Sequence, residues 1–141
     1  MSHATLAAPV LDCFCFQSRL AARRMTAFYE ARLAPHGLNI NQLGILAQVA
    51  ATPAAAMADM AEAMLLDPST LSRTMRPLER EGLIEVAPDP ENRRIRRVRL
   101  TRAGKDRLRA AGRTWARAQA ETAAAAAPLS ALLRATENLP G

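Results

Sequence analysis

The most unusual chemical feature of the chain is a short run of arginines. Five of the seven residues from Arg93 to Arg99 are arginine, and the other two are Ile95 and Val98. Like charges placed this close together repel one another, so the segment costs stability unless an anion comes to meet it. The run therefore predicts a surface that binds a polyanion.

The charge of the whole chain points to the same class of partner. Its 141 residues carry a formal net charge of +6, with an isoelectric point of about 10.9, which favours nucleic acid over an acidic membrane. The two cysteines cannot form a disulfide scaffold, and the apolar N-terminal stretch lacks the basic region of a secretory signal. We expect a cytoplasmic protein with no transmembrane helix.

A helix with a polar, basic face is predicted just before the arginine run. Asp67 is a favoured N-cap, Pro68 suits the first helical position, and Gly82 suits the end of the helix. An apolar stripe would face the core, and the opposite face would expose Ser69, Ser72, Arg73, Arg76 and Arg80. Arginine can read guanine edges with two hydrogen bonds, and serine can contact bases or phosphates. An ordinary solvated amphipathic helix is the alternative for this feature alone.

A β-hairpin is predicted directly after that helix. Residues 83–86 and 95–100 are strand-like, and "PDPEN" between them is a turn. Arg93 and Arg94 would stand at the tip, where a narrow, electronegative minor groove could accept them. The returning strand adds three arginines that could reach phosphates: Arg96, Arg97 and Arg99. The alternative is an edge hairpin kept soluble by its charge, which the neighbouring helix makes less attractive.

Helices are predicted on both sides of this unit. Apolar spacing indicates helices over residues 11–33, 40–51 and 54–64, and Asn39 would cap the second. Thr101 would cap a long helix that reaches residues 123–127, Pro128 would interrupt it, and a last helix would follow. Four helices, a hairpin and two helices give a mainly α fold built around a winged helix-turn-helix.

Two motifs in this order resemble the MarR family of transcriptional regulators. The stretch "LDPSTLSRTMRPLEREGLI" resembles the family's DNA-reading helix, and "DPENRRIRRVRLTRAGK" resembles its wing and the start of the next helix. The family wing commonly reads Asp-x-x-Asp-(Arg/Lys)-Arg before a strand that ends in Leu-Thr. The chain fits that pattern at Asp89, Arg93, Arg94, Leu100 and Thr101. It departs from the pattern at Asn92, where the family often has a second aspartate.

The resemblance implies a homodimer with two regions in each chain. Residues 11–34 and 102–139 would form a helical dimerisation region, and residues 39–100 a winged helix-turn-helix DNA-binding domain. One recognition helix from each chain would enter a major groove of a pseudo-palindromic double-stranded DNA site, and each wing tip would reach the flanking minor groove. Most members repress, and many release DNA when a small phenolic or other anion binds between the two regions.

The same resemblance assigns roles to individual residues. The residues that fall on the part of the helix that reads bases and backbone are Ser69, Thr70, Ser72, Arg73 and Arg76. Arg94 matches the wing-tip arginine, and Asp67 matches an acidic position that can pair with that arginine and orient it. Asn92 would brace the wing with an amide hydrogen bond in place of the usual salt bridge.

Two cysteines are the candidates for sensing a signal. Cys13 and Cys15 would point about 200° apart on a helix, so they cannot easily bond to each other while that helix is intact. They could pair across a dimer interface, oxidise singly, or bind a soft metal such as Cu(I). We expect instead that both pack as small buried hydrophobes beside Phe14 and Phe16.

These features predict a sequence-specific DNA-binding transcriptional regulator that needs no cofactor and no metal. We expect a repressor that a small organic effector releases from DNA. One alternative is a regulator that responds to thiol oxidation or a soft metal through Cys13 and Cys15. An alternative of another class is a non-specific nucleic-acid-binding protein, which would spread its charge over many surfaces. An enzyme is not expected, because no Gly-rich phosphate loop, paired His and carboxylate signature or zinc-ligand spacing is present.

Overall fold

The computed structural model describes residues 9–137 and residue 139. Its helices are α2 (Phe14–Leu33), the short 3-10 helix η1 (Ala34–His36), α3 (Ile40–Ala51), α4 (Met57–Ala63), α5 (Pro68–Arg80) and α6 (Arg102–Thr136). Its strands are β1 (Ile84–Pro88) and β2 (Arg96–Leu100), which pair antiparallel. The chain is therefore mainly helical with one hairpin, as the sequence predicts.

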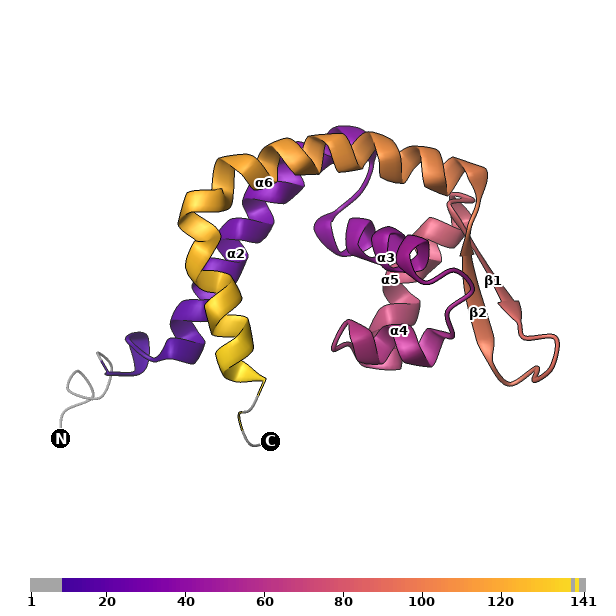
Figure 1. Ribbon diagram of the computed structural model, residues 1–141, viewed down its shortest axis with the longest axis horizontal. Coiled ribbons are helices and arrows are strands. Elements are labelled where there is room, and N and C mark those ends of the chain that lie inside the picture. Colours follow the sequence, from indigo (N-terminus) through magenta and orange to yellow (C-terminus); the bar gives the residue numbers. More distant parts are fainter. Residues whose placement is uncertain (1–8, 138, 140–141) are drawn as a thin grey trace.

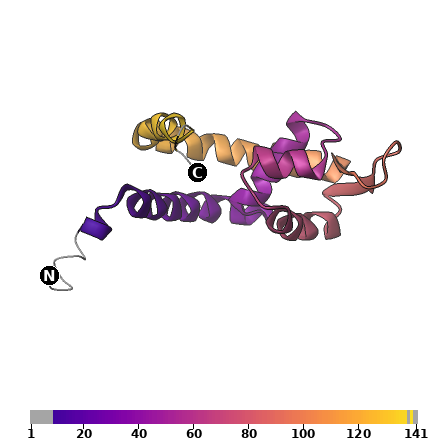
Figure 2. The same ribbon diagram turned by 90° about the horizontal axis from the view of Figure 1, so that it is seen from below.

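The two ends of the molecule are built from different helices and strands. Figure 1 shows α6 arching from the hairpin over the compact group of α3, α4 and α5 to the opposite end, where it meets α2. The start of α2 and the end of α6 lie there, and the view from below in Figure 2 shows the same elongated shape with the hairpin at the far end. We call the hairpin, residues 84–100, the wing.

The N-termini of three helices are fixed by side chains that the sequence analysis singled out. Asn39 forms a reciprocal capping box with Gln42, with distances of 2.8 and 3.0 Å between side-chain oxygen and backbone nitrogen. Asp67 accepts a hydrogen bond from the Thr70 N–H at 2.9 Å, and Thr101 accepts one from the Gly104 N–H at 3.0 Å. These bonds satisfy N–H groups that have no partner within the helix.

The apolar faces of these helices meet in one core. The predicted stripe of α5 is buried, and Leu71, Met75 and Leu78 are each at most 2% exposed. It packs with Ile45 and Leu46 of α3, while Val98 closes the core from the wing. The basic face of α5 is left on the outside.

Helix α4 begins three residues later than predicted, because the preceding residues pair with the wing. Ala54 has a positive φ of 60°, which no helix permits. The Ala55 carbonyl accepts a hydrogen bond from the Val98 N–H at 3.1 Å, and Ala56 forms an isolated antiparallel bridge with Arg97. The turn before α4 thus attaches the wing to the helical core.

The predicted break at Pro128 is wrong, because α6 is one helix of 35 residues. Proline removes a single backbone hydrogen bond, to the Ala124 carbonyl, and kinks a helix more often than it ends one when strong helix formers flank it. The alanines at 123–127 are such residues. Figure 1 shows α6 bending sharply in its last third, where its colour turns from orange to yellow.

The start of α6 lies directly against the beginning of the wing. A Cβ atom at Gly104 would stand 1.9 Å from the carbonyl oxygen of Leu83, so only glycine allows this approach. The Thr101 hydroxyl donates to the Gly82 carbonyl at 2.6 Å on the same side. Within the described residues, no helix has both the length and the apolar character needed to cross a membrane.

Candidate nucleic-acid interface

The N-terminal half of α5 presents hydroxyl groups and arginines to solvent. Ser69, Arg73 and Arg76 are exposed, whereas Thr70 and Ser72 are half-buried. The dipole of the helix places partial positive charge at this end, which adds to the charge of the two arginines. The surface suits phosphate oxygens and the acceptor atoms of base edges.

The Asp67 carboxylate organises the first turn of α5. It accepts hydrogen bonds from the Ser69 and Thr70 hydroxyls, both at 2.5 Å, and from the Thr70 N–H. These three donors, the Ser69 hydroxyl first, hold the pKa of Asp67 well below its usual range. In the part of the chain that the structure describes, no hydrogen bond or ion pair joins Asp67 to Arg94.

The tip of the wing carries exposed arginines. Arg93 and Arg94 are exposed, and the Asn92 side-chain oxygen accepts a weak hydrogen bond of 3.2 Å from the Arg94 N–H. Arg96 is also exposed, with one guanidinium nitrogen 3.3 Å from the Val86 carbonyl. Figure 1 shows the wing tip and the N-terminal end of α5 at the same lower edge of the molecule. One flat or grooved partner can therefore contact both.

A buried carboxylate braces the wing, a role that the sequence alone does not reveal. Asp89 is 7% exposed and accepts hydrogen bonds from the Nε of Arg97 and from the N–H groups of Glu91 and Asn92, the latter two at 2.8 and 3.0 Å. Arg97 also donates to the Ala54 carbonyl at 2.9 Å. The guanidinium of Arg97, followed by the two backbone N–H groups, lowers the pKa of Asp89.

This brace changes the role of one arginine. Arg97 is predicted from the sequence to reach phosphates, but its guanidinium is already bonded to Asp89 and to the Ala54 carbonyl. The signal in the sequence was an aspartate at the start of the turn and an arginine at the second position of the returning strand. Strand alternation alone did not reveal that Arg97 faces the turn before α4.

The two cysteines lie at the other end of the molecule and are exposed. Cys13 is the N-cap residue of α2 and Cys15 lies in its first turn. The expectation that both are buried beside Phe14 and Phe16 is wrong for the single chain, in which Phe14 is 90% exposed. The pattern of apolar neighbours indicated burial, but the helix presents them to solvent. Within the described residues, no group of three or more His, Cys, Asp or Glu side chains could hold a metal ion.

Two adjoining cavities lie between α6 and helices α2 and α3. One of about 520 Å³ is lined by uncharged residues such as Leu43, Ala47 and Leu108, and the other, of about 400 Å³, reaches the Tyr29 side chain. Trp115 borders both cavities. The Tyr29 hydroxyl lies 2.6 Å from the Gln119 side-chain oxygen, to which it donates, and 2.9 Å from the Thr122 hydroxyl.

Comparison with known proteins gives the family. The model of the MarR family matches residues 38–95, from just before α3 to the turn of the wing. Over 89% of this chain and 96% of the other, the chain is 30% identical to the M. tuberculosis transcriptional regulator MosR, solved in complex with DNA, with a TM-score of 0.77. The chain belongs to the MarR family of transcriptional regulators.

Two more distant structures share the fold of this MarR-family chain. BpsR of Bordetella bronchiseptica, whose DNA binding is regulated by 6-hydroxynicotinic acid, has a TM-score of 0.81 at 21% identity over 92% of this chain and 96% of its own. The transcriptional repressor CouR, bound to a 23-mer DNA duplex, has a TM-score of 0.79 at 21% identity over 89% and 93%. No curated protein sequence matches the chain significantly.

Proposed function

We propose that this MarR-family regulator is a homodimeric, cytoplasmic repressor that binds a pseudo-palindromic site in double-stranded DNA. The observation that carries the proposal is the position of two basic elements at one edge of the molecule, the N-terminal half of α5 and the wing tip. It acts by binding DNA rather than by catalysis. The DNA-bound state of MosR, its 30% identical relative, supports the same mode of action.

The two elements suit the two grooves of DNA. A helix with Arg73 and Arg76 exposed can enter the major groove, where arginine discriminates guanine by donating to O6 and N7. Arg93 and Arg94 stand on a narrow hairpin that fits a minor groove, whose negative potential attracts arginine. Arg96 would neutralise backbone phosphate, and the bonds around Asn92 and Asp89 would hold the tip in place.

A homodimer is supported by apolar side chains exposed far from the basic elements. Phe14 at the start of α2 is 90% exposed, and Leu133 near the end of α6 is 61% exposed. Both helix ends lie at the end of the molecule opposite the wing. Exposed apolar surface of this kind marks an interface, and a second copy of the chain would bury it. Symmetric pairing would give the two recognition helices that a pseudo-palindrome requires.

Release by a small organic effector is the regulation we favour. The cavities beside Trp115 lie between the helices of the proposed dimerisation region, α2 and α6, and α3 of the winged region. An effector that fits there better when the protein is off DNA would weaken DNA binding by that difference in affinity. BpsR, whose DNA binding responds to a small molecule, has the same fold.

A thiol-responsive regulator is the second candidate, and the exposure of Cys13 and Cys15 favours it. Reagents can reach both thiols in the single chain. The test compares DNA binding by the reduced, peroxide-treated and Cu(I)-loaded protein with binding by the Cys13→Ser/Cys15→Ser variant. Release that requires the two cysteines would support this candidate, and identical binding in all conditions would reject it.

The proposed DNA binding is tested by fluorescence anisotropy on the DNA upstream of the protein's own gene. We expect tight binding to one pseudo-palindromic segment, and at least about 10³-fold weaker binding to scrambled DNA of the same composition. Sedimentation of the complex should give two chains per duplex. Equal affinity and an equal salt dependence for every sequence would instead establish a non-specific nucleic-acid-binding protein.

A further inference from the structure

The turn that joins α4 to α5 contains a leucine in the left-handed region of backbone conformation. Leu65 has a φ of 52°. Its N–H donates a hydrogen bond of 3.0 Å to the Glu62 carbonyl, and the Leu66 N–H donates one of 2.9 Å to the Ala61 carbonyl. A helix that ends with this pair of bonds usually has glycine at the left-handed position. A branched side chain there crowds the following carbonyl, so leucine makes the turn less stable than glycine would.

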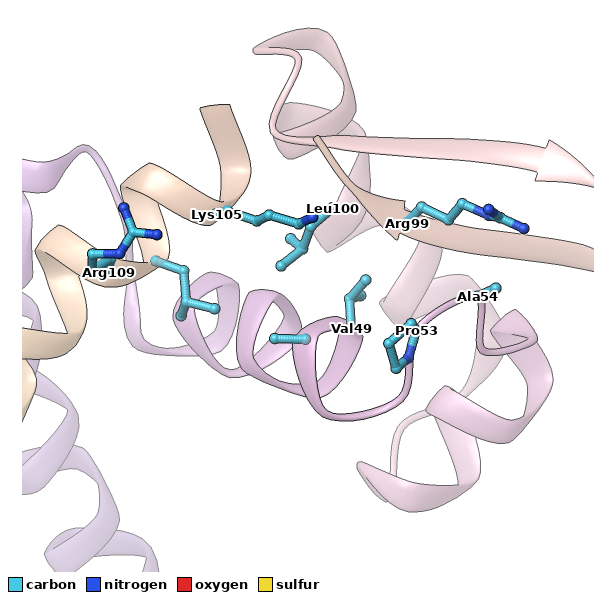
Figure 3. Close-up of a pocket in the computed structure, with 9 residues that line it drawn as sticks. Val49, Pro53, Ala54, Arg99, Leu100, Lys105 and Arg109 are labelled. Atoms are coloured by element: carbon cyan, nitrogen blue, oxygen red, sulfur yellow. The ribbon is translucent and has the colours of Figure 1, made fainter. Parts of the chain in front are cut away.

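The Leu65 side chain is left almost wholly in solvent. It is 92% exposed, the largest exposed fraction of any large apolar side chain in the described residues, whereas its neighbours Met64 and Leu66 pack against the core. The other described non-glycine residue with a positive φ is Ala54, which Figure 3 shows in the turn before α4. The wing explains its conformation, because the Ala54 carbonyl accepts a hydrogen bond from Arg97. Strained residues cluster at binding sites, so the exposed Leu65 points to a partner.

This turn lies beside the part of α5 that is proposed to read DNA. Leu65 precedes the N-cap residue Asp67 by two positions, so their Cα atoms are at most about 7 Å apart. Pro68 and Ser69, in the first turn of α5, are exposed like Leu65. Figure 1 shows the turn between α4 and α5 at the lower edge of the molecule, the edge that the wing tip shares. A duplex that receives the start of α5 would therefore meet the Leu65 side chain as well.

We propose that Leu65 contacts the 5-methyl group of a thymine when α5 enters the major groove. This methyl is the one apolar group that the base pairs present in that groove, and it distinguishes thymine from the other bases. The serines and arginines of α5 suit hydrogen-bonding atoms, so an apolar side chain at its start would add a separate kind of discrimination. The inference rests on the proposed DNA binding and adds the base that each half-site places beside the turn.

Other partners suit the Leu65 side chain less well. Leucine has no donor and no charge, so it cannot hold a phosphate oxygen. A stable protein interface has an apolar centre much larger than one leucine and the adjoining Pro68. The deoxyribose is another apolar part of DNA, but it is the same at every base. Contact with the sugar would therefore give no preference for thymine, which allows an experiment to separate the two.

The test uses operator duplexes in which deoxyuridine replaces thymine at symmetric positions of the two half-sites, one pair of positions at a time. Deoxyuridine lacks only the methyl group and keeps every hydrogen-bonding atom of thymine. Affinity of the full-length protein is measured by fluorescence anisotropy. At one pair of positions the affinity should fall roughly 15-fold, the factor for two buried methyl groups at about 0.8 kcal/mol each.

Three variants assign this effect to one side chain. Leu65→Gly removes the side chain, and its melting temperature should not fall, because glycine adopts a positive φ without strain. It should bind the thymine operator more weakly than wild type, and deoxyuridine at the sensitive pair should cost it nothing further. Leu65→Asn, which also tolerates this conformation, should behave in the same way. Ala63→Gly, the matched control, places a glycine at an exposed position of α4 and should keep the full deoxyuridine effect.

The outcomes separate this contact from the proposed function. If deoxyuridine lowers wild-type affinity at no pair of positions, or if Leu65→Gly binds like wild type, the proposal is overturned. If Leu65→Gly binds more weakly but keeps the full preference for thymine, the side chain contacts deoxyribose and the thymine contact is overturned. Each of these results leaves the proposed function standing, because the wild type still binds its operator. A wild type that binds no operator would overturn the proposed function and this inference together.

Discussion

Asp89 and Arg97 form an ion pair across the wing, and Arg97 also donates a hydrogen bond to the carbonyl of Ala54 in the turn before α4. The pair offsets part of the charge repulsion within the arginine run. One arginine holds the hairpin together, so the wing does not depend wholly on DNA for relief of charge repulsion. The exposed Arg93, Arg94 and Arg96 are left to meet the partner.

Removal of the brace should loosen the wing without removing a DNA contact. Arg97→Met keeps the length of the side chain but breaks the bonds to Asp89 and Ala54. We expect faster backbone hydrogen exchange at residues 89–95 and weaker operator binding with an unchanged salt dependence. Arg96→Met should leave backbone hydrogen exchange unchanged. It should instead reduce the slope of log affinity against log salt concentration by about one. If Arg97→Met instead lowers the salt slope and leaves exchange unchanged, Arg97 contacts phosphate.

The contribution of Asp89 to stability should disappear in acid. Because the folded protein lowers the pKa of Asp89 below its ordinary value of 3.8, the unfolded chain binds the proton more tightly. The stabilisation is complete above that value and is lost as pH falls through the folded-state pKa. In urea unfolding, the free energy of unfolding of wild type should exceed that of Asp89→Asn by a constant difference between about pH 5 and 7. This difference should shrink below about pH 4. Asp67 is present in both proteins, so its titration does not affect the difference between their free energies of unfolding. A margin independent of pH would show that the Asp89 charge contributes nothing.

Two glycines of α6 should respond in opposite directions to the same substitution. Gly104→Ala places a Cβ 1.9 Å from the Leu83 oxygen and should destabilise the protein by about 1–3 kcal/mol or more. Gly112→Ala meets no atom within 4 Å and should stabilise the helix by about 0.5–1 kcal/mol. Urea unfolding at one protein concentration measures both. Similar effects of the two variants would mean that α6 does not approach the base of the wing this closely.

The recognition helix and the wing tip should differ in what they contribute to DNA binding. Arg73→Ala should cost about 1–3 kcal/mol on the operator and relax discrimination at one base position. Arg94→Ala should weaken binding with a smaller loss of sequence preference, since the minor groove carries less sequence information. Anisotropy titrations against single-base operator variants provide the comparison. Operator binding like that of wild type by both variants would remove these residues from the interface.

Local signals in the sequence were sufficient for most of the fold. Asn39, Asp67 and Thr101 mark helix starts through bonds that span only three residues, and the structure confirms each cap. The switch from helical to alternating spacing after Gly82 located the hairpin to within two residues at the strand ends. Such features are encoded by neighbours in the chain, which makes them readable without a structure.

The features that the sequence did not reveal depend on distant contacts. Ala54 looks like a helix former, yet it lies outside α4 because the wing pairs with the residues that follow it. The bracing role of Arg97 depends on that same pairing, so charge pattern alone assigned it to phosphate. The exposure of Cys13 and Cys15 likewise depends on which surface of α2 meets α6. The DNA-contacting residues themselves remain predictions that the variants above will test.

The continuity of α6 has a consequence for the geometry of the operator. Helix α6 has 35 residues and a contour length of about 50 Å. Gly104 in its first turn lies against the base of the wing, and its other end lies at the end of the molecule where α2 begins. In a symmetric pair, the separation of the two recognition helices would be set by the length of α6 and by the bend that Figure 1 shows in it. The spacing of the two half-sites in DNA would then be fixed by the shape of one helix that does not itself touch the bases.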